Sequence, residues 1–156
     1  MDDKDRQIVR VVQAKGRISN QDLSEEVNLS PSPCLRRLRL LEEAGIILGY
    51  TAIVDEAAFG LPVTAFVRIR LQIHDRANIA VFEQAVRAMP AVLDCYLMTG
   101  SADYLLRVLV GSLKAYEDFI RNEIHTIPGV ASVDTSFAYG QVKRATVFPP
   151  VRSDPA

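Results

Sequence analysis

The sequence has few of the residues that build disulfide frameworks or metal sites. It contains two cysteines, Cys34 and Cys95, and two histidines, His74 and His125, all well separated along the chain. Two cysteines do not form the disulfide framework of a small secreted domain, and no spacing typical of metal ligands is present. We therefore expect reduced thiols, structural roles for both histidines, and no bound metal.

Long apolar runs and targeting signals are also missing. No run approaches the roughly 20 apolar residues that span a membrane. The first five residues, Met-Asp-Asp-Lys-Asp, are acidic rather than basic and then apolar, so they do not match a signal peptide. These features predict a cytoplasmic protein that does not bind membranes.

Catalytic signatures are absent as well. We find no pairing of a nucleophile with a base, no glycine loop suited to phosphate and no metal set. An acylphosphatase-like enzyme is the alternative that these absences disfavour, and we predict no enzymatic activity and no cofactor.

Composition predicts an ordinary soluble globular protein of one or two small domains, with 156 residues, 49% hydrophobic and 24% charged. Residues 1–54 carry eight Lys/Arg and eight Asp/Glu, so this half has no broad basic surface. Non-specific coating of nucleic acid needs such a surface. Any DNA binding should therefore depend on two or more copies acting together.

Residues 29–47 are the most informative stretch. Ser30 can cap a helix, Pro31 suits the first helical position and Gly45 suits a left-handed stop. Cys34 and Leu41 belong to an apolar stripe for packing, together with Leu38. Elsewhere the helix offers serine and arginine, as a DNA-reading helix does. The residues predicted to contact DNA are Ser30, Ser32, Arg36, Arg37 and Arg39.

Arg37 has an alternative role, because its position could let it pair with Glu42 or Glu43 inside the domain. A solvated basic face on an ordinary amphipathic helix is the alternative for the whole segment. The upstream sequence favours the DNA-reading interpretation, since residues 3–14 and a segment opened by Ser19 also have helical apolar spacing. Three short helices in under fifty residues predict a tri-helical helix-turn-helix domain.

The second half changes to a period of two. Residues 46–54 are apolar and β-prone, which predicts a strand leaving a domain of residues 1–54, and residues 55–61 look like a linker. Residues 62–150 then predict a ferredoxin-like βαββαβ domain, followed by a tail at 151–156, so the fold class is α+β. The expected strands are 63–73, 92–99, 104–110, 130–138 and 142–148, and the expected helices are 78–89 and 113–124.

The segment 104–110 is apolar on both faces, whereas two helices cover only one side of a four-stranded sheet. The same sheet of a second copy would cover the other side, which predicts a homodimer. A partly exposed sheet face is the alternative.

These two halves, in this order, resemble the Lrp/AsnC family of leucine-responsive and asparagine-responsive transcription regulators. The resemblance runs from about Asp3 to Pro150. Residues 94–108 are most similar to members that control branched-chain keto-acid breakdown, and a second similar group responds to cysteine. The matching segments are 5–8, 16–19, 29–34, Arg37-Leu38, Leu41-Glu42, 45–47, Gly100 with 103–106, and 128–130.

The resemblance implies a dimer that assembles further, to an octamer, and binds a small amino acid that is aliphatic or contains sulfur. The family's effector loop, Gly-Asp-x-Asp, is here Gly100-Ser101-Ala102-Asp103, so one aspartate has become serine. The implied effector-binding residues are Thr99, Gly100, Ser101 and Asp103, with Ser136 reaching them from a neighbouring strand. Asp103 could instead bond its own hairpin backbone.

A second departure from the family is Leu40, where relatives often carry a basic residue. We expect weaker phosphate contacts or an additional helix-packing contact there. The predicted function is an amino-acid-responsive, sequence-specific, oligomeric regulator of transcription that binds double-stranded DNA. The alternatives are a ligand-independent DNA-binding or architectural member and a small-molecule sensor without DNA binding.

Overall fold

The computed structural model describes residues 1–150 and divides the chain into two compact units. A helical unit comprises Met1–Ile53 together with residues 142–150, and a sheet unit comprises Val54–Gln141. Segment 142–150 therefore groups with the helical unit, whereas the sequence assigned it to the second domain. The backbone N–H of Phe148 donates to Oε1 of Gln13 at 3.2 Å, which is one of the contacts of this segment.

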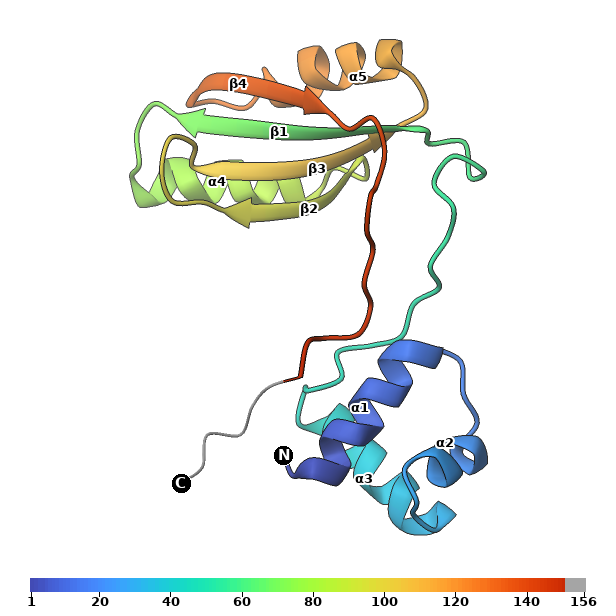
Figure 1. Cartoon of the computed structure of the whole chain (residues 1–156). Coiled ribbons are helices and arrows are strands. Elements are labelled where there is room, and N and C mark those ends of the chain that lie inside the picture. Colours follow the sequence, from blue (N-terminus) through green and yellow to red (C-terminus); the bar gives the residue numbers. More distant parts are fainter. Residues whose placement is uncertain (151–156) are drawn as a thin grey trace. The chain divides into compact units, whose positions relative to one another are not determined.

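The helical unit contains α1 (Asp3–Lys15), α2 (Asn20–Glu26) and α3 (Pro31–Glu43), as Figure 1 shows. Local signals set their limits. Asp2 and Asp5 form a reciprocal capping box at the start of α1, and Ser19 accepts a hydrogen bond from the N–H of Asp22 at the start of α2. Gly45 has φ +67°, which confirms the left-handed stop after α3.

Ser30 occupies the N-cap position of α3, and Pro31 is the first helical residue, as predicted. The Ser30 side chain makes no capping hydrogen bond, so that part of the prediction is wrong. The turn before it is fixed instead by Asn28, whose φ is +52°, and by a 2.9 Å hydrogen bond from the Leu29 N–H to the Ser24 carbonyl. Asparagine tolerates this left-handed conformation better than most residues do.

The helices pack around a small apolar core. Its members come from all three helices and from the turn after α2, and each is at most 8% exposed: Ile8, Val12, Leu23, Val27, Cys34 and Leu41. Polar contacts add to this core, since Nζ of Lys4 donates to the Val27 carbonyl at 2.7 Å and the Asn20 amide donates to the Pro31 carbonyl at 3.0 Å.

Residues 46–54 and 142–148 form no strand in the described part of the chain, so both strand predictions are wrong. Leu48 is 93% exposed and Val142 is fully exposed. An apolar, β-prone sequence becomes a strand only when its backbone finds a partner strand.

The sheet unit has the order β1 (Val63–Leu71), α4 (Arg76–Arg87), β2 (Val92–Leu97), β3 (Tyr104–Val110), α5 (Leu113–Phe119), η1 (Ile120–Ile124) and β4 (Val130–Phe137). The strands form an antiparallel sheet in the order β2-β3-β1-β4, which is the predicted ferredoxin-like plan (Figure 1). The expected helix 113–124 is divided, because its second part is the π-helical segment η1.

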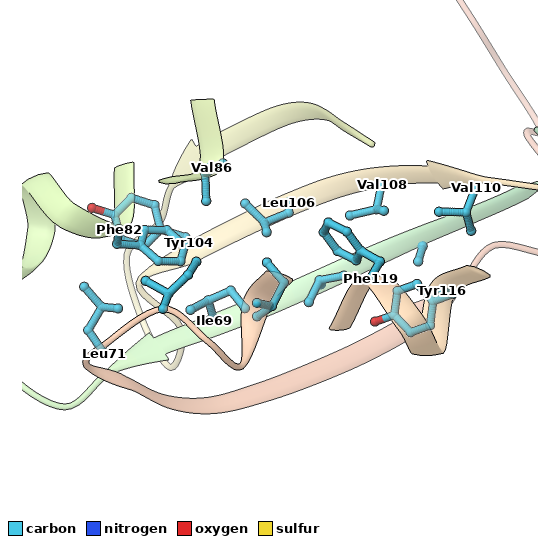
Figure 2. Packing of buried hydrophobic residues seen from close by; sticks show 14 residues of the cluster. Ile69, Leu71, Phe82, Val86, Tyr104, Leu106, Val108, Val110, Tyr116 and Phe119 are labelled. Carbon is cyan, nitrogen blue, oxygen red and sulfur yellow. The ribbon is translucent and has the colours of Figure 1, made fainter. Parts of the chain in front are cut away.

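The core lies between one face of the sheet and the helices. Figure 2 shows Phe82 of α4 beside Tyr104 of β3, with ring centroids 4.5 Å apart, and Leu106 and Val108 further along β3. Leu105 and Leu109 alternate with these residues and lie on the opposite sheet face. Arg107 lies between them on that face and pairs with Asp94 and Glu56, so the second face of β3 is apolar only in part.

Residues 55–61, predicted to be a linker, form a turn attached to the sheet. The Asp55 carboxylate accepts a hydrogen bond from the N–H of Ala58 at 2.9 Å. The carboxylate of Glu56 pairs with the Arg107 guanidinium of β3 at 3.2 Å. Gly111, just after β3, lies against the end of this turn: a Cβ added to Gly111 would be 3.2 Å from the carbonyl oxygen of Gly60.

Candidate functional site

Helix α3 has a buried side and an exposed side. Cys34 and Leu41 are buried in the core, as predicted. The side chains on the opposite side follow the spacing i, i+3, i+4, i+7, i+8 and i+11, which places them on one helix face. This outer face of α3 borders a shallow surface hollow and consists of Ser32, Leu35, Arg36, Arg39, Leu40 and Glu43.

Arg36 and Arg39 are exposed on the outer face, and within residues 1–150 neither forms an ion pair. Ser32 lies one turn before Arg36, and Ser30 is exposed at the helix start. The face therefore presents two guanidinium groups and a hydroxyl group that can bind an external partner. Guanidinium groups of this kind bind phosphates and the O6 and N7 edge of guanine.

Arg37 is engaged within the unit. Its Nη1 is 2.7 Å from a carboxylate oxygen of Asp2 and 2.8 Å from one of Asp5, which joins α3 to the start of α1. The hydrogen bond to Asp5, followed by that to Asp2, raises the pKa of the Arg37 guanidinium. The suggested pairing with Glu42 or Glu43 is wrong, because the acidic partners of Arg37 are Asp5 of α1 and Asp2, the N-cap residue of α1.

Glu42 accepts a hydrogen bond from the Tyr50 hydroxyl at 2.7 Å. Burial, with this hydrogen bond as the second cause, raises the pKa of Tyr50 to about 12. Leu40 is 51% exposed, so it adds no helix-packing contact in the core.

The second candidate site is the hairpin between β2 and β3. Thr99, Gly100 and Ser101 are exposed there, and Gly100 has φ +107°, a conformation that other residues rarely adopt. The Met98 N–H donates to the Asp103 carbonyl at 2.8 Å and closes the hairpin. The predicted loop residues Thr99, Gly100, Ser101 and Asp103 thus lie together on one turn.

Asp103 holds this hairpin against the end of β1. Its carboxylate accepts a hydrogen bond from the Leu71 N–H at 2.7 Å, and its other oxygen is 2.8 Å from Nε2 of His74. The Leu71 N–H is the main cause of the lowered pKa of Asp103, and the hydrogen bond with His74 also lowers it. The Asp103 side chain therefore bonds the backbone of β1, whereas its main-chain carbonyl closes the hairpin.

Nothing in the residue pattern indicated this His74 contact. His74 and Asp103 are 29 positions apart, and only the pairing of β1 with β3 brings them together. The alternation of β1 predicted a strand but not its register against β3.

Ser136 lies elsewhere on the sheet. It pairs with Phe66 in the β1–β4 register, and its hydroxyl accepts a hydrogen bond from the Arg68 guanidinium at 3.3 Å. Asp103 contacts Leu71, five residues further along β1, which corresponds to about 16 Å of strand. The structure does not bring Ser136 to the hairpin of its own chain.

Residues 1–150 contain no group of three His, Cys, Asp or Glu side chains arranged to hold a metal ion. In the same part of the chain, every helix is too short or too polar to cross a membrane.

Two family models match the two halves of the chain. A model described as winged helix-turn-helix DNA-binding matches residues 1–47, and one described as Lrp/AsnC ligand binding domain matches residues 64–148. The matches agree with a helical unit that exposes an arginine face and a sheet unit that carries a hairpin loop. They define a transcription regulator with a DNA-binding domain followed by a ligand-binding domain.

Named relatives cover nearly the whole chain. The DNA-binding transcriptional activator DecR of Escherichia coli is 39% identical over 149 residues, which are 96% of this chain and 98% of that protein. The Bkd operon transcriptional regulator of Pseudomonas aeruginosa is 41% identical over 142 residues, which are 91% and 93% of the two chains.

A solved structure, the complex of a Neisseria meningitidis transcriptional regulator with L-Met, superposes with a TM-score of 0.90 at 37% identity. The match covers 96% of each chain. This chain belongs to the Lrp/AsnC family of transcription regulators, which confirms the family, the fold class and the functional class expected from its motifs.

Proposed function

We propose that the outer face of α3 binds a specific double-stranded DNA site and that a small amino acid bound near the β2–β3 hairpin changes this binding. The observation that carries the proposal is the exposure of Arg36 and Arg39 on one face of α3, since neither forms an ion pair within residues 1–150. In a helix-turn-helix domain such a face enters the major groove. Ser30 and Ser32, at the N-terminal end of α3, would contribute hydroxyl contacts to bases or phosphates.

Arg37 would support this contact indirectly. Its guanidinium already binds two carboxylates, Asp2 and Asp5, and its side chain is only 29% exposed. We assign it to fixing α3 against α1, with any phosphate contact secondary to that role.

The proposed effector is aliphatic or contains sulfur, and the L-Met in the related regulator supports the second class. A free amino acid presents an ammonium and a carboxylate. The Asp103 carboxylate has acceptor positions beyond those used by Leu71 and His74, and an ammonium can bind there. Backbone N–H groups beside Gly100 suit the ligand carboxylate, because Gly100 has no side chain and no atom beyond its chain neighbours lies within 4 Å of the position that a Cβ would occupy there.

A specific observation favours one alternative, a ligand-independent DNA-binding member of the family. Asp103 already has a backbone partner and a histidine partner, and Ser101 supplies no second carboxylate. Calorimetry of the full chain with each of the twenty amino acids separates the two functions. Heat with one or a few of them supports sensing, whereas no heat with any supports the alternative.

We propose that the chain forms a dimer through the sheet face opposite the helices, and that dimers assemble further, to an octamer by analogy with the family. Leu105 and Leu109 lie on this face. Tyr96, 55% exposed, pairs with Leu105, and Phe66, 36% exposed, pairs with Arg107, which lies between the two leucines. Light scattering of the full chain should show a dimer or a larger species. A monomer at micromolar concentration would contradict the dimer.

DNA binding is tested by recovering genomic fragments with the full chain and with an Arg36→Ala, Arg39→Ala variant. The wild type should enrich a small set of related sequences that the variant does not recover. Equal enrichment by both proteins would contradict the assignment of the outer face of α3.

Since the target is chromosomal, we place the protein in the cytoplasm.

A further inference from the structure

The outer face of α3 includes two leucines beside its arginines. Leu40 is 51% exposed and Leu35 is half-buried, although the buried side of the same helix already supplies Cys34 and Leu41 to the core. Both leucines border the same hollow as Arg36 and Arg39. The surface that faces DNA in the proposed function is therefore partly apolar.

The spacing places each leucine next to an arginine. Leu40 follows Arg36 by four residues and Leu35 precedes Arg39 by four residues, so each pair lies one turn apart on the helix surface. Glu43, the acidic member of the face, follows Leu40 by three residues and Arg39 by four, so it borders the C-terminal end of the face. The face before Glu43, from Ser32 to Leu40, combines positive charge with apolar area.

Among the base pairs, A·T alone presents an apolar group in the major groove, which is the C5-methyl of thymine. The positive charge of Arg36 and Arg39 complements phosphates at the groove edges, which favours DNA over a protein as the partner of these leucines. We propose that Leu35 and Leu40 read thymine methyl groups, so that the preferred site has thymines at fixed positions beside the bases or phosphates contacted by the arginines. This inference rests on the proposed DNA-binding function.

The test uses a duplex that the full-length protein selects from a random pool. Each thymine of this duplex is replaced in turn by deoxyuridine, which lacks only the methyl group. Loss of one buried methyl contact should weaken wild-type binding about fourfold at one or two positions and leave the others unchanged. The Leu40→Ala variant should be insensitive to uracil at one of these positions and Leu35→Ala at another.

A matched control is Leu48→Ala, which removes a leucine that is 93% exposed and lies outside α3. It should keep the complete wild-type pattern. A wild type that binds the uracil duplexes as tightly as the thymine duplex would overturn the inference while leaving DNA binding intact. Uracil sensitivity that persists in both leucine variants would also overturn it, and failure to select any duplex would overturn the proposed function as well.

Discussion

The helical unit and the sheet unit differ in the contacts that stabilise them. They also differ in whether the charged side chains of their candidate sites already have partners within the chain. The helical unit has six buried apolar core residues and joins its helices further with polar contacts such as Arg37 to Asp2. The sheet unit has a larger core against one sheet face. On α3 the arginines of the outer face form no ion pair in the described chain, whereas Asp103 already has two partners.

Because of this difference, substitutions at the two sites should have different consequences for ligand binding and for the local structure. Removing Arg36 or Arg39 should change what the protein binds with little effect on its fold. Changing Asp103 alters both a candidate ligand contact and the attachment of the hairpin to β1. Experiments on the two sites therefore need different controls.

The largest expected effect is on the sheet core. Phe82 is fully buried against Tyr104, so Phe82→Ala should lower the free energy of unfolding of the sheet unit by about 3–5 kcal/mol. Denaturant unfolding, monitored by hydrogen exchange of the amides in each unit, measures this free energy. Val81→Ala, at a neighbouring position that is 46% exposed, is the control. Equal destabilisation of the helical unit would show that the two units do not unfold separately.

The next effect concerns DNA affinity. Arg36→Ala and Arg39→Ala should each weaken binding by roughly 1–3 kcal/mol if the arginine contacts a base. A phosphate contact would give a smaller loss and a shallower dependence on salt. Fluorescence anisotropy at several salt concentrations distinguishes these cases. Arg76→Ala, an exposed arginine on α4, removes the same charge and should bind as the wild type does.

A smaller effect is expected at Arg37. Arg37→Met removes the partner of Asp2 and Asp5 and should modestly destabilise the helical unit at pH 7. The pKa of Asp2 is lowered in the folded state, first by the Asp5 N–H and then by Arg37. The stabilisation is therefore complete above the ordinary pKa of 3.8 and is lost as pH falls through the lowered value.

Thermal unfolding of both proteins between pH 7 and pH 2 measures this effect. The difference between wild type and Arg37→Met should shrink at the acidic end of the series. A difference that stays constant down to pH 2 would show that Arg37 stabilises the unit by packing alone.

Much of the fold could be predicted because its signals are local. Pro31 and Gly45 marked the ends of α3, and the alternation along residues 63–71 predicted β1. Apolar composition misled the prediction at residues 46–54 and 142–148, since a strand also needs a partner that these segments do not have within the described chain.

The candidate sites were predictable in position but not in partners. The helical period identified the outer face of α3, yet it gave no means to pair Arg37 with Asp5, which is 32 positions away. The loop motif indicated Asp103, but its contacts with Leu71 and His74 depend on strand register. The position of Ser136 likewise depends on the register of β4 against β1, which the residue pattern does not determine.

The central claim is that an amino acid bound at the hairpin controls DNA binding by α3. Its most direct test is operator affinity with and without L-Met and the other amino acids, for the wild type and for Asp103→Asn. The asparagine keeps an acceptor for the Leu71 N–H and removes the charge, and Asp118→Asn on α5 is a control that removes an exposed carboxylate elsewhere. We predict that at least one amino acid shifts the affinity of the wild type and of Asp118→Asn but not that of Asp103→Asn. An undiminished shift in Asp103→Asn, or no shift in the wild type with any of the twenty amino acids, would contradict the account.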